Sequence, residues 1–174
     1  MKKFLIVVDM QKDFVDGALG TKDAVSIVPA VVEKINNFKG KIIVTYDTHN
    51  ENYMDSAEGK NLPVPHCIKG TDGWQLNSEV ASALEDKKYT VVEKPTFGSV
   101  ELPKIIENFA GTEAFSIELI GLCTDICVVS NALLLKANFP ETKISVDPCC
   151  CAGVTRESHL AALATMKMCQ INLL

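Results

Sequence analysis

Short apolar runs alternate along this chain with longer segments in which apolar residues recur at helical spacing. Short, continuous apolar runs are typical of strands buried on both faces, whereas apolar residues three and four positions apart indicate a helix with one buried face. The predicted strands are 4–8, 41–46, 89–93, 115–122, 143–146 and a closing segment, 169–173. The predicted helices are 25–38, 75–84, 102–109, 124–136 and 155–168.

Strand and helix alternate throughout, which predicts a parallel sheet covered by helices on both faces. We therefore expect an α/β fold, Rossmann-like, with three α/β/α layers and a six-stranded, mainly parallel sheet. No internal repeat or linker divides the chain, so residues 1–174 are expected to form one domain. In such sheets ligands bind beyond the C-terminal ends of the strands. This rule directs attention to the residues that follow each predicted strand.

The sequence GLCTDICVV, residues 121–129, joins a predicted strand to a predicted helix. It places Cys127 in the first helical turn, where unpaired N–H groups and the helix dipole favour negative charge. We expect this setting to lower the pKa of the thiol and to provide a nucleophile, with nearby N–H groups able to stabilise an oxyanion. The alternative is a buried cysteine that packs as a small hydrophobic side chain.

Two charged residues end other predicted strands. Asp9 follows the run FLIVV, and Lys94 follows YTVVE. A carboxylate can take the proton of a thiol, and a neighbouring ammonium favours both the ionised carboxylate and the thiolate. The combination of Asp9, Lys94 and Cys127 is therefore more specific than any of the three alone. The alternatives are a surface cap for Asp9 and a solvated lysine for Lys94.

A long polar stretch, 47–74, carries a second group of candidate residues. Connections of this length in a compact domain are usually functional. Asp47 and His49 lie two residues apart just beyond a strand, and His66 follows in LPVPHCIKG. An aspartate and two histidines suit zinc, iron or manganese, with open positions for water or substrate, and Glu58 is a candidate fourth ligand. The alternative is a polar loop that contains histidine by chance.

The composition of the chain limits the classes of function that it can have. A net charge of −5 and a pI near 5.2 give no support for binding to nucleic acid or to an anionic membrane. The N-terminal apolar run is too short for a signal peptide, and no stretch is long enough to span a bilayer, so we expect a soluble, cytoplasmic protein.

The seven cysteines are an odd number without a secretion signal and are expected to be reduced. Three of them, 149–151, are expected at a buried strand end rather than at a metal. A third histidine, His159, is expected to be structural.

The residues singled out so far resemble a known family. Asp9 in VVDMQKDF, Lys94, and Cys127 in GLCTDICV are similar to the cysteine hydrolases of the isochorismatase-like superfamily, and the similarity extends over nearly the whole chain. The sequences DTH and PHCIKGTDGW further resemble the nicotinamidase/pyrazinamidase branch. Two features depart from that branch near the substrate pocket: Pro63 stands where an aromatic residue is common, and the segment KPTFGS is short.

This resemblance implies hydrolysis of nicotinamide to nicotinate and ammonia through a thioester on Cys127. Asp9 would take the thiol proton and later protonate the leaving ammonia, and Lys94 would hold Asp9 ionised. Backbone N–H groups of Cys123 and Cys127 would form the oxyanion hole, and the Leu122–Cys123 peptide bond would be cis. The alternatives are a related hydrolase acting on another small amide, or a non-catalytic member of the fold that binds a small ligand.

The resemblance also implies a divalent metal ion on Asp47, His49 and His66, zinc in the first place and iron or manganese as alternatives. The metal would orient the substrate rather than generate the nucleophile. Phe14 and Phe97 are expected to line the substrate pocket, with core packing as the alternative for both. Members of the family commonly assemble, so a homo-oligomer is expected.

Overall fold

A computed structural model describes residues 1–174 and contains one six-stranded sheet. The strands lie in the order β3-β2-β1-β4-β5-β6, and every neighbouring pair is parallel. Their bounds are β1 Lys2–Val8, β2 Lys41–Asp47, β3 Tyr89–Lys94, β4 Phe115–Leu122, β5 Lys143–Ala152 and β6 Asn172–Leu173. The α/β fold with a six-stranded parallel sheet is therefore confirmed.

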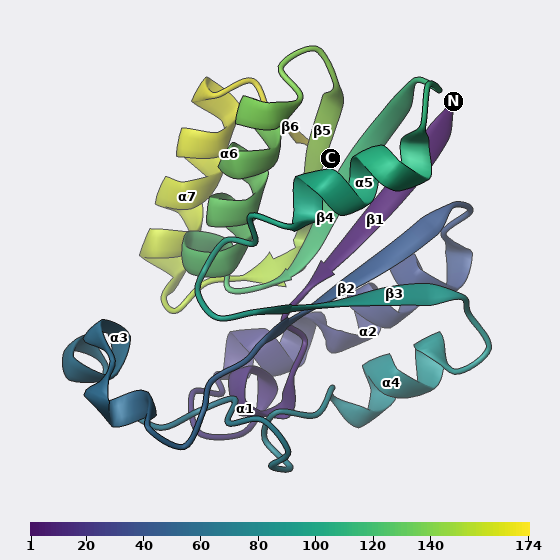
Figure 1. The fold of residues 1–174 in the computed structure, drawn as a ribbon. Coiled ribbons are helices and arrows are strands. Elements are labelled where there is room, and N and C mark those ends of the chain that lie inside the picture. Colours follow the sequence, from purple (N-terminus) through teal and green to yellow (C-terminus); the bar gives the residue numbers. More distant parts are fainter.

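Helices cover both faces of the sheet (Figure 1). The helices are α1 Lys12–Val15, α2 Lys22–Asn37, α3 Ala57–Asn61, α4 Ser78–Leu84, α5 Leu102–Ala110, α6 Val129–Asn138 and α7 Arg156–Met168. One hydrophobic core joins the sheet to α5, α6 and α7, and the other joins it to α1, α2 and α4. None of these helices combines the length and the apolar character required to cross a bilayer.

The central strand β1 shows why the predicted strands are apolar without alternation. Successive side chains of a strand point to opposite faces of the sheet. Phe4, Ile6 and Val8 therefore enter one core, and Leu5 and Val7 enter the other. Because helices cover both faces, each of these positions is buried, and an unbroken apolar run results.

The strand order reverses between β1 and β4, which are neighbours in the sheet although far apart in the chain. Such a switch point, at the C-terminal ends of the strands, is where ligands bind in doubly wound sheets. Gly121 is paired with Val8 across this point and has a φ of 116°. A Cβ atom at Gly121 would lie 2.1 Å from the carbonyl oxygen of Val8, so only glycine fits there.

Several element bounds differ from the prediction. The helix expected over 124–136 begins as a π-helical turn, η2 Thr124–Val128, before α6 continues to Asn138. The stretch 47–74 is not wholly irregular, since it contains a 3₁₀ turn, η1 Tyr53–Asp55, and α3. The short helix α1 was not predicted, because a single turn is too short to show a helical period.

Helix α2 begins earlier than its apolar pattern indicates. Thr21 caps it by accepting the N–H of Ala24 (3.0 Å), so the helix starts at Lys22 and Pro29 lies inside it rather than near its start. A proline in a helix interior removes one backbone hydrogen bond. The buried positions that follow it, including Val31 and Ile35, keep the helix on the sheet.

The three consecutive cysteines lie in the last part of β5, as expected. Cys150 and Cys151 are buried in opposite cores, whereas Cys149 is exposed. The closing strand β6 is shorter than the predicted 169–173.

Candidate active site

Asp9, Lys94 and Cys127 meet at the switch point of the sheet. The Lys94 ammonium lies 2.7 Å from Oδ2 of Asp9 and 3.4 Å from Sγ of Cys127. All three side chains are buried, with at most 4% of any of these residues exposed. The three residues come from the end of β1, the end of β3 and the π-helical turn, so the fold brings together residues that the sequence analysis grouped by strand ends.

A buried lysine requires partners that compensate for lost hydration. Besides Asp9 and Cys127, Lys94 donates to Oδ1 of Asp47 (3.2 Å) and to the carbonyl oxygen of Thr96 (3.1 Å). Burial by itself would lower the pKa of Lys94, but the charges of Asp9, Cys127 and Asp47 outweigh it and raise that pKa above its usual value. Lys94 is therefore a permanent cation at the centre of the site.

Asp9 is held by Thr45 on the neighbouring strand. The hydroxyl of Thr45 donates to Oδ1 of Asp9 (2.6 Å), and the backbone N–H of Asp9 donates to the carbonyl oxygen of Thr45 (3.2 Å). The other oxygen, Oδ2, forms a buried ion pair with the Lys94 ammonium (2.7 Å). Burial raises the pKa of Asp9 even though Lys94 and Thr45 act to lower it. Its Oδ2 atom is therefore well placed to accept a proton.

The low thiol pKa expected for Cys127 from its place at a helix start is wrong. Burial and the neighbouring charge of Asp9 raise the pKa of the Cys127 thiol well above its usual value, against the opposing effect of Lys94. A few N–H groups at a helix start do not compensate for the desolvation of a thiolate. The proton of Cys127 consequently has to pass to a base within the site. The Leu122–Cys123 peptide bond before this turn is cis, as the resemblance implied.

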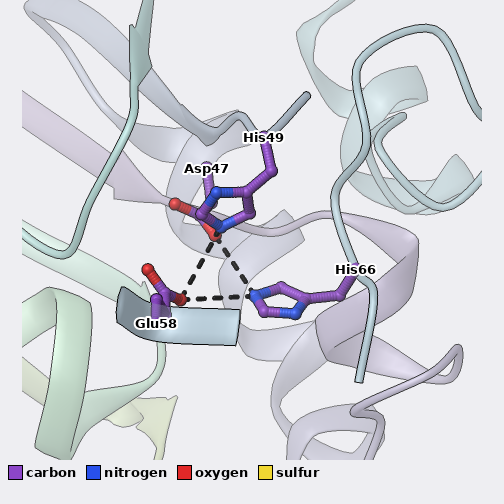
Figure 2. A group of neighbouring side chains, drawn as sticks. All are labelled: Asp47, His49, Glu58 and His66. Carbon is purple, nitrogen blue, oxygen red and sulfur yellow. Dashed lines mark hydrogen bonds and ion pairs between the residues drawn. The ribbon is translucent and has the colours of Figure 1, made fainter. Parts of the chain in front are cut away.

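Four metal-ligating side chains form a second cluster beside these residues (Figure 2). Oδ2 of Asp47 lies 2.9 Å from Nε2 of His49 and 3.5 Å from Nε2 of His66. Oε1 of Glu58 lies 3.7 Å from each of these two nitrogens. The four candidate ligand atoms lie within 4.8 Å of one another, so every residue predicted for the metal, Glu58 included, is in the cluster.

The chemistry of this cluster fits a divalent metal ion. Nδ1 of His66 donates to the carbonyl oxygen of Val64 (2.8 Å), which leaves the lone pair of Nε2 directed at the cluster. Two imidazoles and two carboxylates form a donor set that suits zinc, iron or manganese. Burial and the charge of Asp47 raise the pKa of Glu58. A cation would relieve this repulsion between two neighbouring carboxylates.

A cavity of about 230 Å³ adjoins both groups of residues. Phe14 and Phe97 both line it, as predicted. Phe14 is buried, with its ring centroid 5.4 Å from that of His66, whereas Phe97 is 42% exposed. Pro63, which the sequence analysis noted, is not among the residues of the wall. The lining is mainly apolar and consists of Phe14, Leu19, Thr21, Ala24, Asp47, Glu58, Leu62, His66, Phe97, Leu122, Cys123, Ile126, Cys127, Gly153 and Val154.

Comparison with known proteins agrees with this geometry. The family model described as the Isochorismatase domain matches residues 3–173. The chain belongs to the isochorismatase family. Within it, the chain is 29% identical over 175 residues to the uncharacterized isochorismatase family protein PncA of Bacillus subtilis strain 168, an alignment that covers 94% of this chain and 93% of that one. It is 25% identical over 185 residues to the nicotinamidase/pyrazinamidase of Mycobacterium tuberculosis H37Rv, covering 97% and 96%.

Solved structures of other isochorismatase-family proteins have the same fold. The nicotinamidase/pyrazinamidase PncA of Bacillus subtilis superposes with a TM-score of 0.85 at 26% identity over 99% of both chains. The pyrazinamidase of Pyrococcus horikoshii in complex with zinc gives 0.84 at 26% identity over 100% of this chain and 99% of that one. The pyrazinamidase/nicotinamidase of Streptococcus mutans UA159 gives 0.85 at 27% identity over 99% and 100%. The predicted resemblance to the nicotinamidase/pyrazinamidase branch is confirmed.

In this family member, sequence analysis missed the residues that hold the loop with the candidate metal ligands. Gln11 is fully buried; its amide accepts the N–H of Asp47 (2.7 Å) and donates to the carbonyl oxygens of Asp47 and Trp74 (2.9 Å each). Asp13 accepts the N–H of Cys67 (2.8 Å), directly after His66. Gln11 and Asp13 both lie in VVDMQKDF, the segment that also contains Asp9. Their polar side chains, so close to a predicted site residue, were the signal that could have identified them.

His159 was predicted to be structural, and it lies outside the cavity. Its Nδ1 atom shares a hydrogen bond with Oγ1 of Thr124 (2.8 Å), which attaches α7 to the turn that carries Cys127. Asp125, in the same turn, accepts the backbone N–H of Val154 (3.1 and 3.2 Å). These contacts hold the turn to α7 and to the residues that follow β5.

Proposed function

We propose that the protein is a cysteine-dependent amidohydrolase that converts nicotinamide and water to nicotinate and ammonia. The observation that carries the proposal is the contact of one buried ammonium, Lys94, with both the carboxylate of Asp9 and the sulfur of Cys127, next to an apolar cavity. A protein that only binds a ligand has no need of a thiol beside a buried acid and base. The matched nicotinamidases and pyrazinamidases support an amide as substrate.

In the first half-reaction, Oδ2 of Asp9 takes the thiol proton of Cys127 as the sulfur attacks the carboxamide carbon. Lys94 stabilises the negative charge that moves between these two groups. Asp9 then gives the proton to the departing nitrogen, and ammonia leaves a thioester on Cys127. Burial raises the pKa of the Cys127 thiol, so the mechanism gives its proton to Asp9.

In the second half-reaction, Asp9 removes a proton from a water molecule, which attacks the thioester carbon. The C–S bond breaks, the sulfur regains its proton, and the carboxylic acid is released. In both halves the developing oxyanion is assigned to the backbone N–H groups of Cys123 and Cys127. Phe14 and Phe97 supply apolar walls for an aromatic ring.

We further propose that Asp47, His49, His66 and Glu58 hold a zinc ion. The donor set suits zinc, iron or manganese, and the zinc complex of the Pyrococcus horikoshii pyrazinamidase supports the choice of zinc among them. When bound, the metal supplies a Lewis acid that fixes the orientation of a donor atom on the substrate. The neighbouring residues Gln11 and Asp13 keep the ligand loop in place.

The deciding experiment is ammonia release from a panel of small amides, with nicotinamide first, measured with and without a chelator. Turnover of nicotinamide, reduced by the chelator, is the expected result. Turnover of a different amide alone would retain the hydrolase and reject nicotinamide. Binding of the amides without any ammonia release would favour a non-catalytic ligand-binding protein.

Three broader expectations remain predictions. We propose that residues 1–174 act as one domain, that the chain forms a homo-oligomer and that it works in the cytoplasm. Light scattering coupled to size-exclusion chromatography measures the oligomeric state directly.

A further inference from the structure

Asn131 is buried on α6, one turn after Cys127. Its amide nitrogen donates to the carbonyl oxygens of Cys127 (2.8 Å) and Phe97 (3.1 Å), and its amide oxygen accepts the backbone N–H of Ser99 (2.9 Å). A buried amide is tolerated where its donors and acceptors are matched. Here both donors and the acceptor oxygen are used, so the side chain is fixed in a single orientation.

These hydrogen bonds connect α6 to a segment with little structure of its own. Residues 95–98 form no backbone–backbone hydrogen bonds. Two side chains hold this segment: Lys94 donates to the carbonyl oxygen of Thr96 (3.1 Å), and Asn131 donates to that of Phe97. The position of the segment relative to the helix that follows Cys127 therefore depends on Asn131.

The same segment serves the proposed chemistry at two points. The carbonyl oxygen of Thr96 is a partner of the Lys94 ammonium, which lies 3.4 Å from Sγ of Cys127. The side chain of Phe97 lines the cavity. Movement of the segment would therefore shift the cation and one wall of the substrate site together.

We propose that Asn131 is a positioning residue that locks residues 95–99 onto the nucleophile-bearing helix. It keeps the Lys94 ammonium and the wall at Phe97 at fixed distances from Cys127. The kinetic consequence rests on the proposed function, whereas the locking itself requires no substrate. A misplacement of about 1 Å in such a site can lower the rate about 100-fold.

The kinetic test compares Asn131→Ala with Asn138→Ala. Asn138 is a matched control on the same helix, because its amide also donates to the carbonyl four residues back, that of Leu134 (2.9 Å), but it is exposed and lies about two turns beyond Asn131. We expect Asn131→Ala to lower kcat/KM of nicotinamide hydrolysis about 100-fold, with kcat reduced and KM raised. Asn138→Ala should leave both constants unchanged. In a Phe97→Ala background the effect on KM should shrink, since both changes remove the same wall.

Hydrogen exchange tests the locking without any enzymatic activity. In Asn131→Ala, the amides of residues 96–99 should exchange faster while β3 and α5 keep their protection. In the unaltered protein, the Ser99 amide should exchange more slowly than that of Gly98, which donates no hydrogen bond to the backbone. If Asn131→Ala does not fold, two measurements still test the locking. One is the comparison of Ser99 with Gly98 in the unaltered protein, and the other is the exchange of the segment in Asn131→Asp, a variant of equal size.

Unchanged amide exchange of residues 96–99 in a folded variant, or equal exchange at Ser99 and Gly98, would overturn the proposal. Unchanged kcat and KM in a folded Asn131→Ala that hydrolyses nicotinamide would overturn it as well. Faster exchange of the segment in a protein that hydrolyses no amide would support the locking and reject the proposed function instead.

Discussion

Asp47 and Lys94 join the two halves of the site through a single carboxylate. Oδ1 of Asp47 lies 3.2 Å from the Lys94 ammonium, and Oδ2 of the same group lies 2.9 Å from Nε2 of His49. The two residues are paired across β2 and β3, so the register of the sheet sets this contact. Loss of a candidate metal ligand such as His49 therefore removes a partner of Oδ2. A change at the nucleophile acts through Lys94, the partner of Oδ1.

The first prediction concerns the metal. His49→Ala should lower the affinity for zinc more than about 100-fold, because it removes a ligand atom rather than a supporting contact. Metal content after dialysis, measured by elemental mass spectrometry, checks this, with His159→Ala as the control that retains the metal. Ammonia release should fall in His49→Ala, through a higher KM or a lower kcat. Full metal content in His49→Ala would refute the assignment of His49 as a metal ligand.

The second prediction concerns the nucleophile. Cys127→Ala should keep the fold and lower kcat/KM by at least about three orders of magnitude, because the members of such a triplet act as a unit. Circular dichroism and ammonia release measure the two properties. Cys149→Ala and Cys169→Ala are the matched controls, since both cysteines are free and exposed. Retained activity in Cys127→Ala would end the claim that this sulfur attacks the substrate.

The third prediction concerns the hydrogen bond between Thr45 and Asp9. Thr45→Val removes the donor to Oδ1 of Asp9, whereas Thr45→Ser retains it. Loss of a hydrogen bond to the charged carboxylate raises its pKa further. Because the reaction requires ionised Asp9, the acidic limb of the kcat/KM profile should move to higher pH in Thr45→Val only. The unsatisfied oxygen should also cost about 1–3 kcal/mol of stability, measurable by urea unfolding. Identical pH profiles for the two variants would argue against the role of Thr45.

The fourth prediction links stability to pH through His159. Burial, assisted by Arg156, lowers the pKa of His159 below its usual value. In the unfolded chain this imidazole takes up a proton near pH 6.5, whereas in the folded chain it does so only at lower pH. Its contribution to stability is therefore complete above about pH 6.5 and is lost as the pH falls through the folded pKa. As the pH is lowered from about 7.5 to about 5, the free energy of unfolding should fall less for His159→Gln than for the unaltered protein. Equal losses in urea unfolding would contradict this.

The fifth prediction tests the switch point. Gly121→Ala should destabilise the fold by more than about 2 kcal/mol, because its Cβ would meet the carbonyl of Val8 and its φ is positive. Gly111→Ala separates the two effects, since Gly111 also has a positive φ but a Cβ atom there would meet nothing within 4 Å. Gly111 has a ψ of −127°, outside the left-handed helical region, so that control should itself cost about 1–3 kcal/mol, and Gly121→Ala should cost more because the contact with Val8 is added. Thermal or urea unfolding of both variants provides the comparison, and equal losses would show that the contact with Val8 is unimportant.

Sequence patterns were sufficient for the order of the elements and for the edge of the sheet at which the site lies. Apolar runs such as 4–8 identified strands covered on both faces, and parallel strands carry whatever follows them to one common edge. Asp9, Asp47, Lys94 and Cys127 could therefore be grouped without coordinates. Element ends were less accurate: the cap at Thr21 extended α2, and a π-helical turn preceded α6.

The chemical groups of the site, and the edge of the sheet that they share, follow from the residue types and the strand pattern. Their protonation and orientation follow from the folded environment. Burial raised the thiol pKa that the helix start alone would lower, and Thr45, Gln11 and Asn131 became positioning partners through contacts with residues more than 30 positions away. Desolvation and hydrogen-bond matching depend on what surrounds a group in space, and local sequence spacing contains no record of those neighbours.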